Sequence, residues 1–576
     1  MVNLKINNIP VSVPEGTTIL EAAKTIGIKI PTLCYMKEIN EIGACRVCVV
    51  EVKGARSYVA ACVYPVNENM EVFTDTPGVR AARKTTLELI LSNHNKSCLS
   101  CERNMNCELQ ALSYEYGCDI TAYRGAVTPS EVDESTEFLV RDNSKCVLCR
   151  RCVATCKEVQ KVSVIGPRNR GFLTDIGCAF EEGLGDSSCA ACGQCIVVCP
   201  TGALKEKSEI DNVRAAIADP EKVVIAGTAP AVRAALGEEF GYPIGTNVEG
   251  KMVSALNLLG FDKVFDVNFT ADLTIMEESH EFLQRATKGE NLPLITSCSP
   301  GWIRFMEYYY PELINNVSSC KSPQQMFGAV IKTYYAQKMG IDPKNIYVVG
   351  VMPCTSKKFE KTRDGQSASG YPDVDAVITT RELARMIKGS GIIFNDLPDG
   401  KFDAPLGEYS GAGVIFGATG GVMEAALRTA VEKLTGESLA SVDFTEVRGT
   451  EGIKEATYTV AGKQINVAVA HGLANAKKLC EEIKNGTSKY HFIEIMGCPG
   501  GCVNGGGQPI QSAFVRRNND IRTLRASVLY DIDKNSKIRK SHENALVTKL
   551  YDEFFGEPGS HKAHEVLHTT YVNRKK

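Results

Sequence analysis

Two segments carry the same cysteine pattern, KCVLCRRCVATC at 145–156 and SCAACGQCIVVCP at 188–200. Each has the spacing C-x2-C-x2-C-x3-C, formed by Cys146, Cys149, Cys152 and Cys156 in the first and by Cys189, Cys192, Cys195 and Cys199 in the second. Thiolates at this spacing bind 4Fe–4S clusters, and the fourth cysteine of each run ligates the other cluster. The duplication predicts a two-cluster domain over residues 138–209.

This spacing is the signature of bacterial two-cluster ferredoxins. We therefore assign one 4Fe–4S cluster to Cys146, Cys149, Cys152 and Cys199, and the other to Cys189, Cys192, Cys195 and Cys156. Cys178 lies between the two runs and is expected to be unligated.

Composition separates an electron-handling front third from the rest of the chain. Of the 23 cysteines among 576 residues, 17 precede residue 200 and six follow it. We expect no secretory signal at the strand-like start MVNLKINNIPVSV, so dense cysteine favours metal ligation over disulfides. The net charge of −3 gives no case for nucleic-acid binding, and no apolar run predicts membrane insertion. We expect a cytoplasmic protein of three or four domains.

The first cysteine group predicts a 2Fe–2S site in a domain over residues 1–79. It has the spacing C-x10-C-x2-C-x13-C and consists of Cys34, Cys45, Cys48 and Cys62. Strand-like runs surround it, with one short helix in TTILEAAKTIG that Thr17 or Thr18 can cap. The layout is similar to that of plant-type ferredoxins, although the spacing differs. Zinc is the alternative, because four thiolates also suit that ion.

The second group predicts a 4Fe–4S cluster with one histidine ligand, in a domain over residues 80–125. It has the spacing H-x3-C-x2-C-x5-C and consists of His94, Cys98, Cys101 and Cys107. Neutral imidazole in place of a thiolate would raise the cluster's reduction potential. Zinc is a stronger rival here than at the first group. Cys118 falls outside the pattern and is expected to be a structural thiol.

From about residue 220 strand signals alternate with helical ones. KVVIAGTAP precedes a helical AVRAALGEEF, and KVFDVNF precedes a helix that begins near residue 271. Three further apolar runs, LPLITSC, NIYVVGVMPC and HFIEIMGCPGGC, each end in cysteine. Alternation predicts an α/β core, and strand carboxyl ends are the usual place for its chemistry. Three such ends bearing cysteine predict a buried metal site.

The motifs TSCSPGW (296–302), MPCTSKKFE (352–360) and EIMGCPGGCVNGGG (494–507) are similar to the three signatures of FeFe (iron-only) hydrogenases. The whole chain resembles the large clostridial form, with its four accessory iron–sulfur clusters. The resemblance implies a multidomain α/β and α+β protein, in which ferredoxin-like front domains precede an α/β catalytic domain at 210–576. It also implies reversible reduction of protons to H2.

The family's active site is the H-cluster, a 4Fe–4S cubane linked to a diiron unit with carbon monoxide, cyanide and a bridging dithiolate amine. By resemblance Cys354, Cys498 and Cys502 are cubane ligands, Cys502 bridges to the diiron unit, and Lys357 hydrogen-bonds a cyanide. The implied lining of the diiron pocket is Ala229, Pro230, Gln324, Met352 and Met496. The glycines at 500, 501 and 505–507 would allow close backbone approach.

The resemblance also implies a proton relay, which runs from a cysteine near the bridging amine through Glu278, Ser318 and Glu281 to Arg285. The two glutamates are three residues apart and share a helix face. A solvated acidic face is the ordinary interpretation of such a pair. A buried carboxyl with a raised pKa is what a relay requires.

The first motif departs from the family pattern, which has two adjacent cysteines, a relay cysteine followed by the fourth cubane ligand. Here the pair is Cys298 and Ser299. An ungapped alignment places the serine at the ligand position, whereas thiolate softness favours Cys298 as the iron ligand. A third account is a cubane with three thiolates only.

Partners and alternatives follow from the same resemblance. We expect ferredoxin, or flavin- and NAD(P)-binding partner subunits, as electron partners, and maturation proteins that install the diiron unit. No G-x-G-x-x-G follows a strand, so nucleotide chemistry would belong to a partner. The alternative is a hydrogen sensor or a non-catalytic iron–sulfur assembly homologue.

Overall fold

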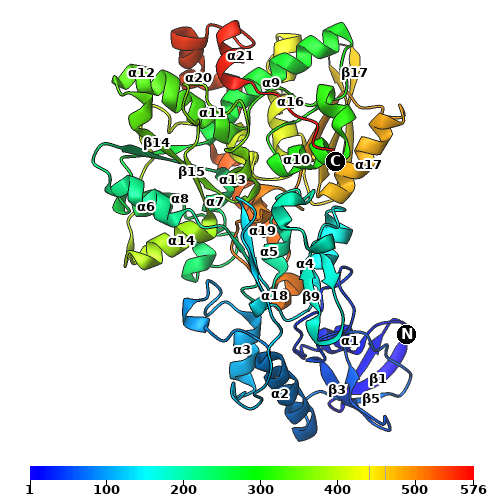
Figure 1. Cartoon of the computed structure of the whole chain (residues 1–576). Helices are drawn as coiled ribbons and strands as arrows, with labels where there is room; N and C mark the ends of the chain where they lie inside the picture. The colour runs from blue at the N-terminus through cyan, green and yellow to red at the C-terminus, as the bar shows by residue number, and fades with distance from the viewer. Residues whose placement is uncertain (440, 461, 576) are drawn as a thin grey trace.

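The computed structural model describes every residue except 440, 461 and 576. A large body formed by the later two-thirds of the chain stands above the blue and cyan segments of the first third (Figure 1). Among the described helices, none combines the length and the apolar character that crossing a bilayer would need.

The N-terminal sheet has the strand order β2-β1-β5-β3-β4 and packs against helix α1. Alternating residues of β1 and β2 bury one face, as the sequence predicts. Thr18 caps α1, since its hydroxyl accepts the Glu21 N–H at 3.3 Å. The elements are β1 (Val2–Ile6), β2 (Ile9–Val13), α1 (Ile19–Thr25), β3 (Val49–Val52), β4 (Val59–Ala60) and β5 (Glu71–Phe73).

The histidine-containing group lies between two helices, α2 (Pro77–Ser92) and α3 (Glu108–Glu115). Both helices share a small apolar cluster with the first domain. The duplicated region follows, with the sheet order β10-β7-β6, a hairpin of β8 and β9, and two short helices that follow the CxxC turns. Its elements are β6 (Val132–Asp133), β7 (Leu139–Asp142), α4 (Arg151–Ala154), β8 (Gly166–Arg168), β9 (Asp175–Gly177), α5 (Gln194–Val198) and β10 (Leu204–Glu206).

The catalytic body contains two four-stranded sheets. The first has the order β12-β11-β14-β15, all parallel; the second has the order β13-β18-β17-β16 and is antiparallel only between β16 and β17. Their strands are β11 (Val223–Thr228), β12 (Lys263–Asp266), β13 (Leu294–Ile295), β14 (Ile346–Met352), β15 (Ala376–Thr379), β16 (Ile453–Val460), β17 (Lys463–His471) and β18 (Phe492–Met496). Parallel sheets of this kind confirm the predicted α/β architecture.

Helix α9 (Asn268–Lys288) contacts α11 (Pro323–Val330), α15 (Gly411–Ile415) and α16 (Gly421–Thr435), and its first half is buried. The remaining helices are α6 (Ile210–Ala218), α7 (Pro230–Arg233), α8 (Glu249–Leu258), α10 (Pro300–Tyr309), α12 (Ala336–Met339), α13 (Ser356–Glu360), α14 (Thr380–Gly389), α17 (Leu473–Lys484), α18 (Ala513–Asn518), α19 (Ile521–Asn535), α20 (Ala545–Leu550) and α21 (His561–Leu567).

One predicted helix is shorter than the sequence suggested. AVRAALGEEF forms only α7 and a separate 3₁₀ turn at Leu236–Phe240, because the backbone leaves the helical region at Ala235 (φ −133°). Gly237 follows this break, where an added Cβ would lie 3.0 Å from Val248. The local sequence favours a helix, but tight packing in the catalytic body interrupts it.

Candidate iron–sulfur chain and active site

The structure brings the thiols of the duplicated region together in the crossed-over sets expected from the spacing. Burial raises the pKa of Cys152, and the neighbouring thiols Cys149, Cys199 and Cys146 raise it further. Burial likewise raises the pKa of Cys195, with Cys192, Cys189 and Cys156 as its next neighbours. All these thiols are free. Buried thiols that form no disulfide fit cluster ligation, because iron binds the deprotonated sulfur.

The first N-terminal group also forms a compact site, and the second contains an unusual histidine. Cys34 interacts with Cys45, and Cys48 with Cys62, in a buried cradle. In the histidine-containing group the Nδ1 atom of His94 is buried and has no hydrogen-bond partner. Burial lowers the pKa of His94 to about 4, so the imidazole is neutral at physiological pH. A neutral ring with an unpaired buried nitrogen fits a metal ligand.

Both N-terminal sites lie against the same cluster site of the duplicated region. The side-chain amide of Asn40, which is buried, donates to the Cys34 carbonyl at 2.8 Å and to the Cys149 carbonyl at 3.0 Å. From the histidine-containing segment, Arg103 donates to the Cys199 carbonyl at 2.8 Å. With clusters bound, these contacts would give a branched path with two arms that converge on Cys149 and Cys199.

The other duplicated site lies against the catalytic body. The Cys498 thiol is 4.0 Å from the Cys192 carbonyl, and Gly193 closely approaches Gly506 of the third motif. Thr355 and Ser356 each donate to the Ala191 carbonyl at 2.9 Å. The path thus continues into the catalytic cysteines.

The three motifs meet between the carboxyl ends of the two sheets. Cys298 follows β13, Cys354 follows β14, and Cys498 follows β18, so each predicted strand end delivers its cysteine. The glycine-rich loop fits closely against these ends: a Cβ on Gly505 would lie 2.2 Å from the Pro353 carbonyl oxygen, and Gly501 has φ +92°. Only glycine is compatible with such an approach and such a backbone.

The residues expected to line the diiron pocket are all buried: Met352 and Met496 end β14 and β18, Ala229 and Pro230 follow β11, and Gln324 lies on α11. The Oε1 atom of Gln324 has no hydrogen-bond partner. Lys357 Nζ donates to Ser322 Oγ (2.7 Å), to Glu360 Oε2 (2.9 Å) and to the Cys298 carbonyl (3.2 Å). A cyanide would therefore have to share or replace one of these acceptors.

The predicted relay residues are arranged in the expected order. Glu278 is buried and its Oε1 is unpartnered, whereas the Ser318 hydroxyl donates to Glu281 at 2.8 Å and Glu281 pairs with Arg285 at 2.6 Å. Burial, with the Glu281 charge, raises the pKa of Glu278 to about 8. Glu278 is thus protonated at neutral pH, unlike the solvated acidic face that the sequence alone would favour.

Cys298 and Ser299 point to different neighbours. Burial raises the pKa of Cys298, and the next contributions come from Glu278 and Cys502. The Ser299 hydroxyl instead accepts the Gly497 N–H at 3.0 Å, one residue before Cys498. The thiol therefore lies near both the relay residue Glu278 and the predicted ligand Cys502, whereas the hydroxyl is bound beside Cys498.

Sequence reasoning missed two residues that support this site. Glu494 is buried beside Cys298 and accepts the Gly420 and Met423 N–H groups at 2.7 Å each. Gln160 donates to the Gly497 carbonyl at 3.0 Å from the duplicated region. Glu494 precedes the third motif's cysteines, and a carboxylate within the apolar strand FIEIM was the available signal.

Family models match every region of the chain. The C-terminal domain of the iron-only hydrogenase large subunit matches 222–506 and the iron hydrogenase small subunit matches 519–574. A 2Fe-2S iron-sulfur cluster binding domain matches 1–77, and an NADH-ubiquinone oxidoreductase-G iron-sulfur binding region matches 83–121. The ferredoxin-like domain of NADH-quinone oxidoreductase subunit 3 matches 137–205. Iron–sulfur binding is therefore favoured over zinc in the front third.

Two relatives align over their full length. The NADP-reducing hydrogenase subunit HndD of Solidesulfovibrio fructosivorans is 49% identical over all of both chains. Iron hydrogenase 1 of Clostridium pasteurianum is 45% identical over 99% of this chain and 100% of its own. Among solved structures, a variant of apo FeFe-hydrogenase HydA1 from Chlamydomonas reinhardtii matches with a TM-score of 0.58 and 44% identity, covering 64% of this chain and all of that one. This chain belongs to the FeFe (iron-only) hydrogenases and is an oxidoreductase that acts on H2.

Proposed function

We propose that the chain reduces protons to H2 reversibly at a six-iron H-cluster held between the two sheets. Electrons would reach it through one 2Fe–2S and three 4Fe–4S clusters. The observation that carries this proposal is the approach of the Cys192 loop to Cys498, which joins the branched path to the catalytic cysteines. When bound, the H-cluster supplies the site at which electrons and protons combine.

We propose that Cys298, Glu278, Ser318, Glu281 and Arg285 carry protons to that site. The relay's inner carboxyl is neutral and buried, whereas its outer glutamate pairs with Arg285 at 2.6 Å. A neutral acid next to the Cys298 thiol can give up its proton inward and regain one from Ser318. Cys354, Cys498 and Cys502 would hold the cubane, with Lys357 and the buried methionines around the diiron unit.

We propose that Ser299 takes the fourth cubane position and that Cys298 serves the relay. The preference of iron for thiolate favours the opposite assignment. The Ser299 hydroxyl supports the first assignment, because it is bound to Gly497 N–H next to Cys498, and the Cys298 thiol has Glu278 among its neighbours, together with Cys502. Ser299→Cys should then retain cubane iron longer under chelation than the wild-type chain, and Cys298→Ala should retain it equally well. Faster iron loss from Cys298→Ala would reverse the assignment.

The electron partners are proposed to be flavin- and NAD(P)-binding subunits, or a ferredoxin. The two converging arms support more than one donor, and the relative from S. fructosivorans is named as a subunit of an NADP-reducing enzyme. Leu99 and Met105, which lie between the cysteines of the histidine-containing group, are 94% and 93% exposed, as a surface that contacts a partner would be.

The test is H2 evolution by the matured chain with reduced ferredoxin, followed by the same assay with candidate flavoprotein partners and NAD(P)H. We expect evolution with ferredoxin and H2 oxidation with an oxidised acceptor. An intact diiron unit, seen by its carbon monoxide and cyanide infrared bands, without turnover in either direction would refute catalysis and favour a sensor.

A further inference from the structure

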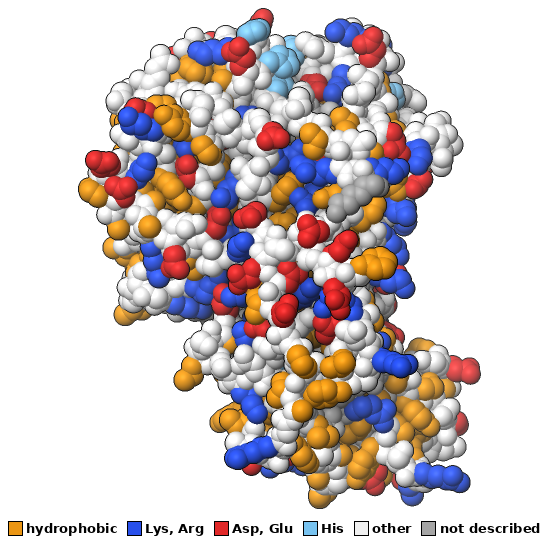
Figure 2. All heavy atoms as spheres, viewed as in Figure 1, with side chains coloured by type: hydrophobic (Ala, Val, Ile, Leu, Met, Phe, Trp, Pro, Cys, Tyr) orange, Lys and Arg blue, Asp and Glu red, His pale blue; other side chains and the backbone are white. Residues whose placement is uncertain are grey.

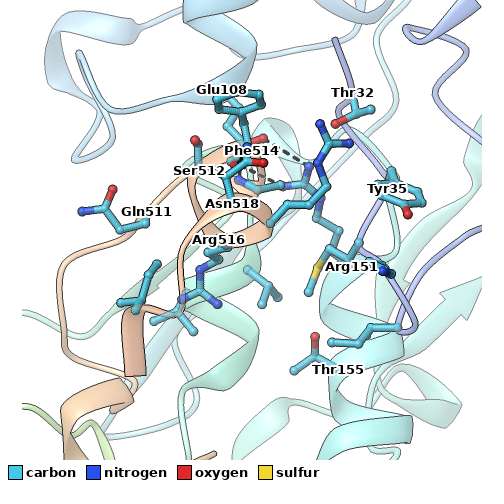
Figure 3. Close-up of a pocket in the computed structure, with 18 of the residues that line it drawn as sticks. Thr32, Tyr35, Glu108, Arg151, Thr155, Gln511, Ser512, Phe514, Arg516 and Asn518 are labelled. Carbon is cyan, nitrogen blue, oxygen red and sulfur yellow. Dashed lines mark hydrogen bonds and ion pairs between the residues drawn. The ribbon is translucent and has the colours of Figure 1, made fainter. Parts of the chain in front are cut away.

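A cleft of about 1020 Å³ lies where the accessory domains meet the catalytic body (Figure 3). Its walls come from the 29–39 loop of the N-terminal domain, from residues 105–115 and 151–159, and from the segment 511–522 around α18. Four arginines line it, Arg151, Arg516, Arg517 and Arg522, and the first three each have a buried Nε atom without a hydrogen-bond partner.

Arg516 is the exceptional member of this group. Within the part of the chain that the structure describes, its guanidinium makes no hydrogen bond and no ion pair. Its neighbours include two further cations, Arg525 and Arg151, and two carboxylates, Glu108 and Glu238. These five groups carry three positive and two negative charges, so one positive charge is unmatched.

Neither carboxylate is free to neutralise Arg516. Glu108 holds Arg151 with both oxygens, at 2.8 and 3.1 Å. Glu238 holds Arg525 with both oxygens, at 2.7 Å each, and also accepts the Gln511 side chain at 2.7 Å. Arg516 therefore lies between two complete ion pairs without joining either.

The buried Nε atom of Arg516 has lost its hydration without gaining a hydrogen bond, which is costly, while the side chain as a whole stays partly exposed to the cleft. Burial, with the nearby Arg525, lowers the pKa of Arg516 to about 10, so the group remains charged at neutral pH. A cation that stays charged on the wall of a large cleft would attract an anion that enters the cleft.

We propose that this cleft binds a small molecule through a phosphate group held by Arg516. The guanidinium presents a planar fork of donors that suits phosphate oxygens, and Arg517 and Arg522 add positive charge to the wall of the same cleft. The cleft is far larger than a phosphate ion, and Tyr35 and Phe514 provide ring faces on its walls (Figure 3). These features favour a phosphate attached to a larger, partly aromatic body.

Calorimetric titration of the cluster-loaded chain tests this proposal, with inorganic phosphate in one arm and ADP in the other, both at constant ionic strength in chloride. We expect saturable binding in at least one arm. Tighter binding of ADP than of inorganic phosphate would show that the cleft also binds the larger group attached to the phosphate. Arg516→Gln should weaken that binding at least about tenfold, because a charge-assisted hydrogen bond is lost, and Arg516→Lys should give an intermediate affinity.

Lys37→Gln is the matched control, since this exposed lysine lines the same cleft and its loss changes the charge equally. It should change the affinity less than about twofold, because exposed charges are screened. As a second readout, Arg516→Leu without phosphate should melt no lower than the wild type. Absence of binding in both arms, equal affinity in Arg516→Gln, or a lowered melting temperature in Arg516→Leu would overturn the proposal.

Discussion

The front third and the catalytic body are stabilised in different ways. Around α2 and α3 the apolar cluster contains only six fully buried residues, whereas the largest core of the catalytic body joins both faces of a parallel sheet. The catalytic body also contains buried ion pairs, such as Arg233 with Asp266. Hydrophobic side chains are widespread on the surface of the lower segment in Figure 2. The contrast predicts that bound iron would stabilise the segment around α2 and α3, where apolar burial is scarce, more than it stabilises the catalytic body.

Removal of iron should break this contrast most strongly. On anaerobic chelation we expect the amides of residues 93–125 to lose hydrogen-exchange protection, because His94 and its three cysteines would no longer be joined. The amides of β11 and β14 should remain protected, since their sheet has its own core. Hydrogen exchange with mass spectrometry gives the measurement. Equal loss of protection in both regions would mean that the whole fold depends on its clusters.

Glu278→Gln separates catalysis from electron supply. We expect H2 evolution to fall by roughly 10²–10⁴-fold, the usual contribution of a positioned acid or base. The accessory clusters should retain their paramagnetic signals, because Glu278 is remote from them in the fold. Glu290→Gln, an exposed residue just beyond the same helix, is the control.

The same residue predicts a pH effect with a definite sign. Because burial raises the pKa of Glu278 to about 8, the carboxyl is protonated at pH 7 and ionises as the pH rises through that value. An infrared band of the neutral acid should disappear over this range in the wild type and be absent in Glu278→Gln. A band that persists well above pH 8, or vanishes below pH 6, would contradict the assignment.

Arg233→Leu probes the buried ion pairs of the catalytic body. Arg233 and Asp266 are both fully buried and 2.8 Å apart, so the substitution should lower the free energy of unfolding by about 3–5 kcal/mol. The cost should shrink at low pH. The pKa of Asp266 is already raised to about 6 by burial, and a protonated Asp266 no longer needs a cation. Arg233→Leu with Asp266→Asn should recover part of the loss in chemical denaturation.

The features that could be predicted from the sequence are those that depend on the spacing of residues close together in the chain. The accessory ligand sets follow from cysteine intervals, and the strands that deliver Cys298, Cys354 and Cys498 follow from apolar runs. The sequence could not predict Asn40 between Cys34 and Cys149, or Gly193 against Gly506, because these contacts join segments far apart in the chain. The unpaired state of Arg516 likewise depends on which carboxylates other arginines occupy. Charge balance in three dimensions leaves no pattern in sequence.

His94→Cys should have the smallest effect and would sharpen the comparison between the two arms of the path. A fourth thiolate adds negative charge, so the cluster's reduction potential should fall by roughly 100 mV. H2 evolution should change by less than about threefold, because the arm through Asn40 still reaches Cys149. Redox titration followed by electron paramagnetic resonance measures the potential. His94→Ala tests ligation directly: an unchanged cluster signal in that variant would show that His94 is no ligand, and its buried, unpaired nitrogen would then need another explanation.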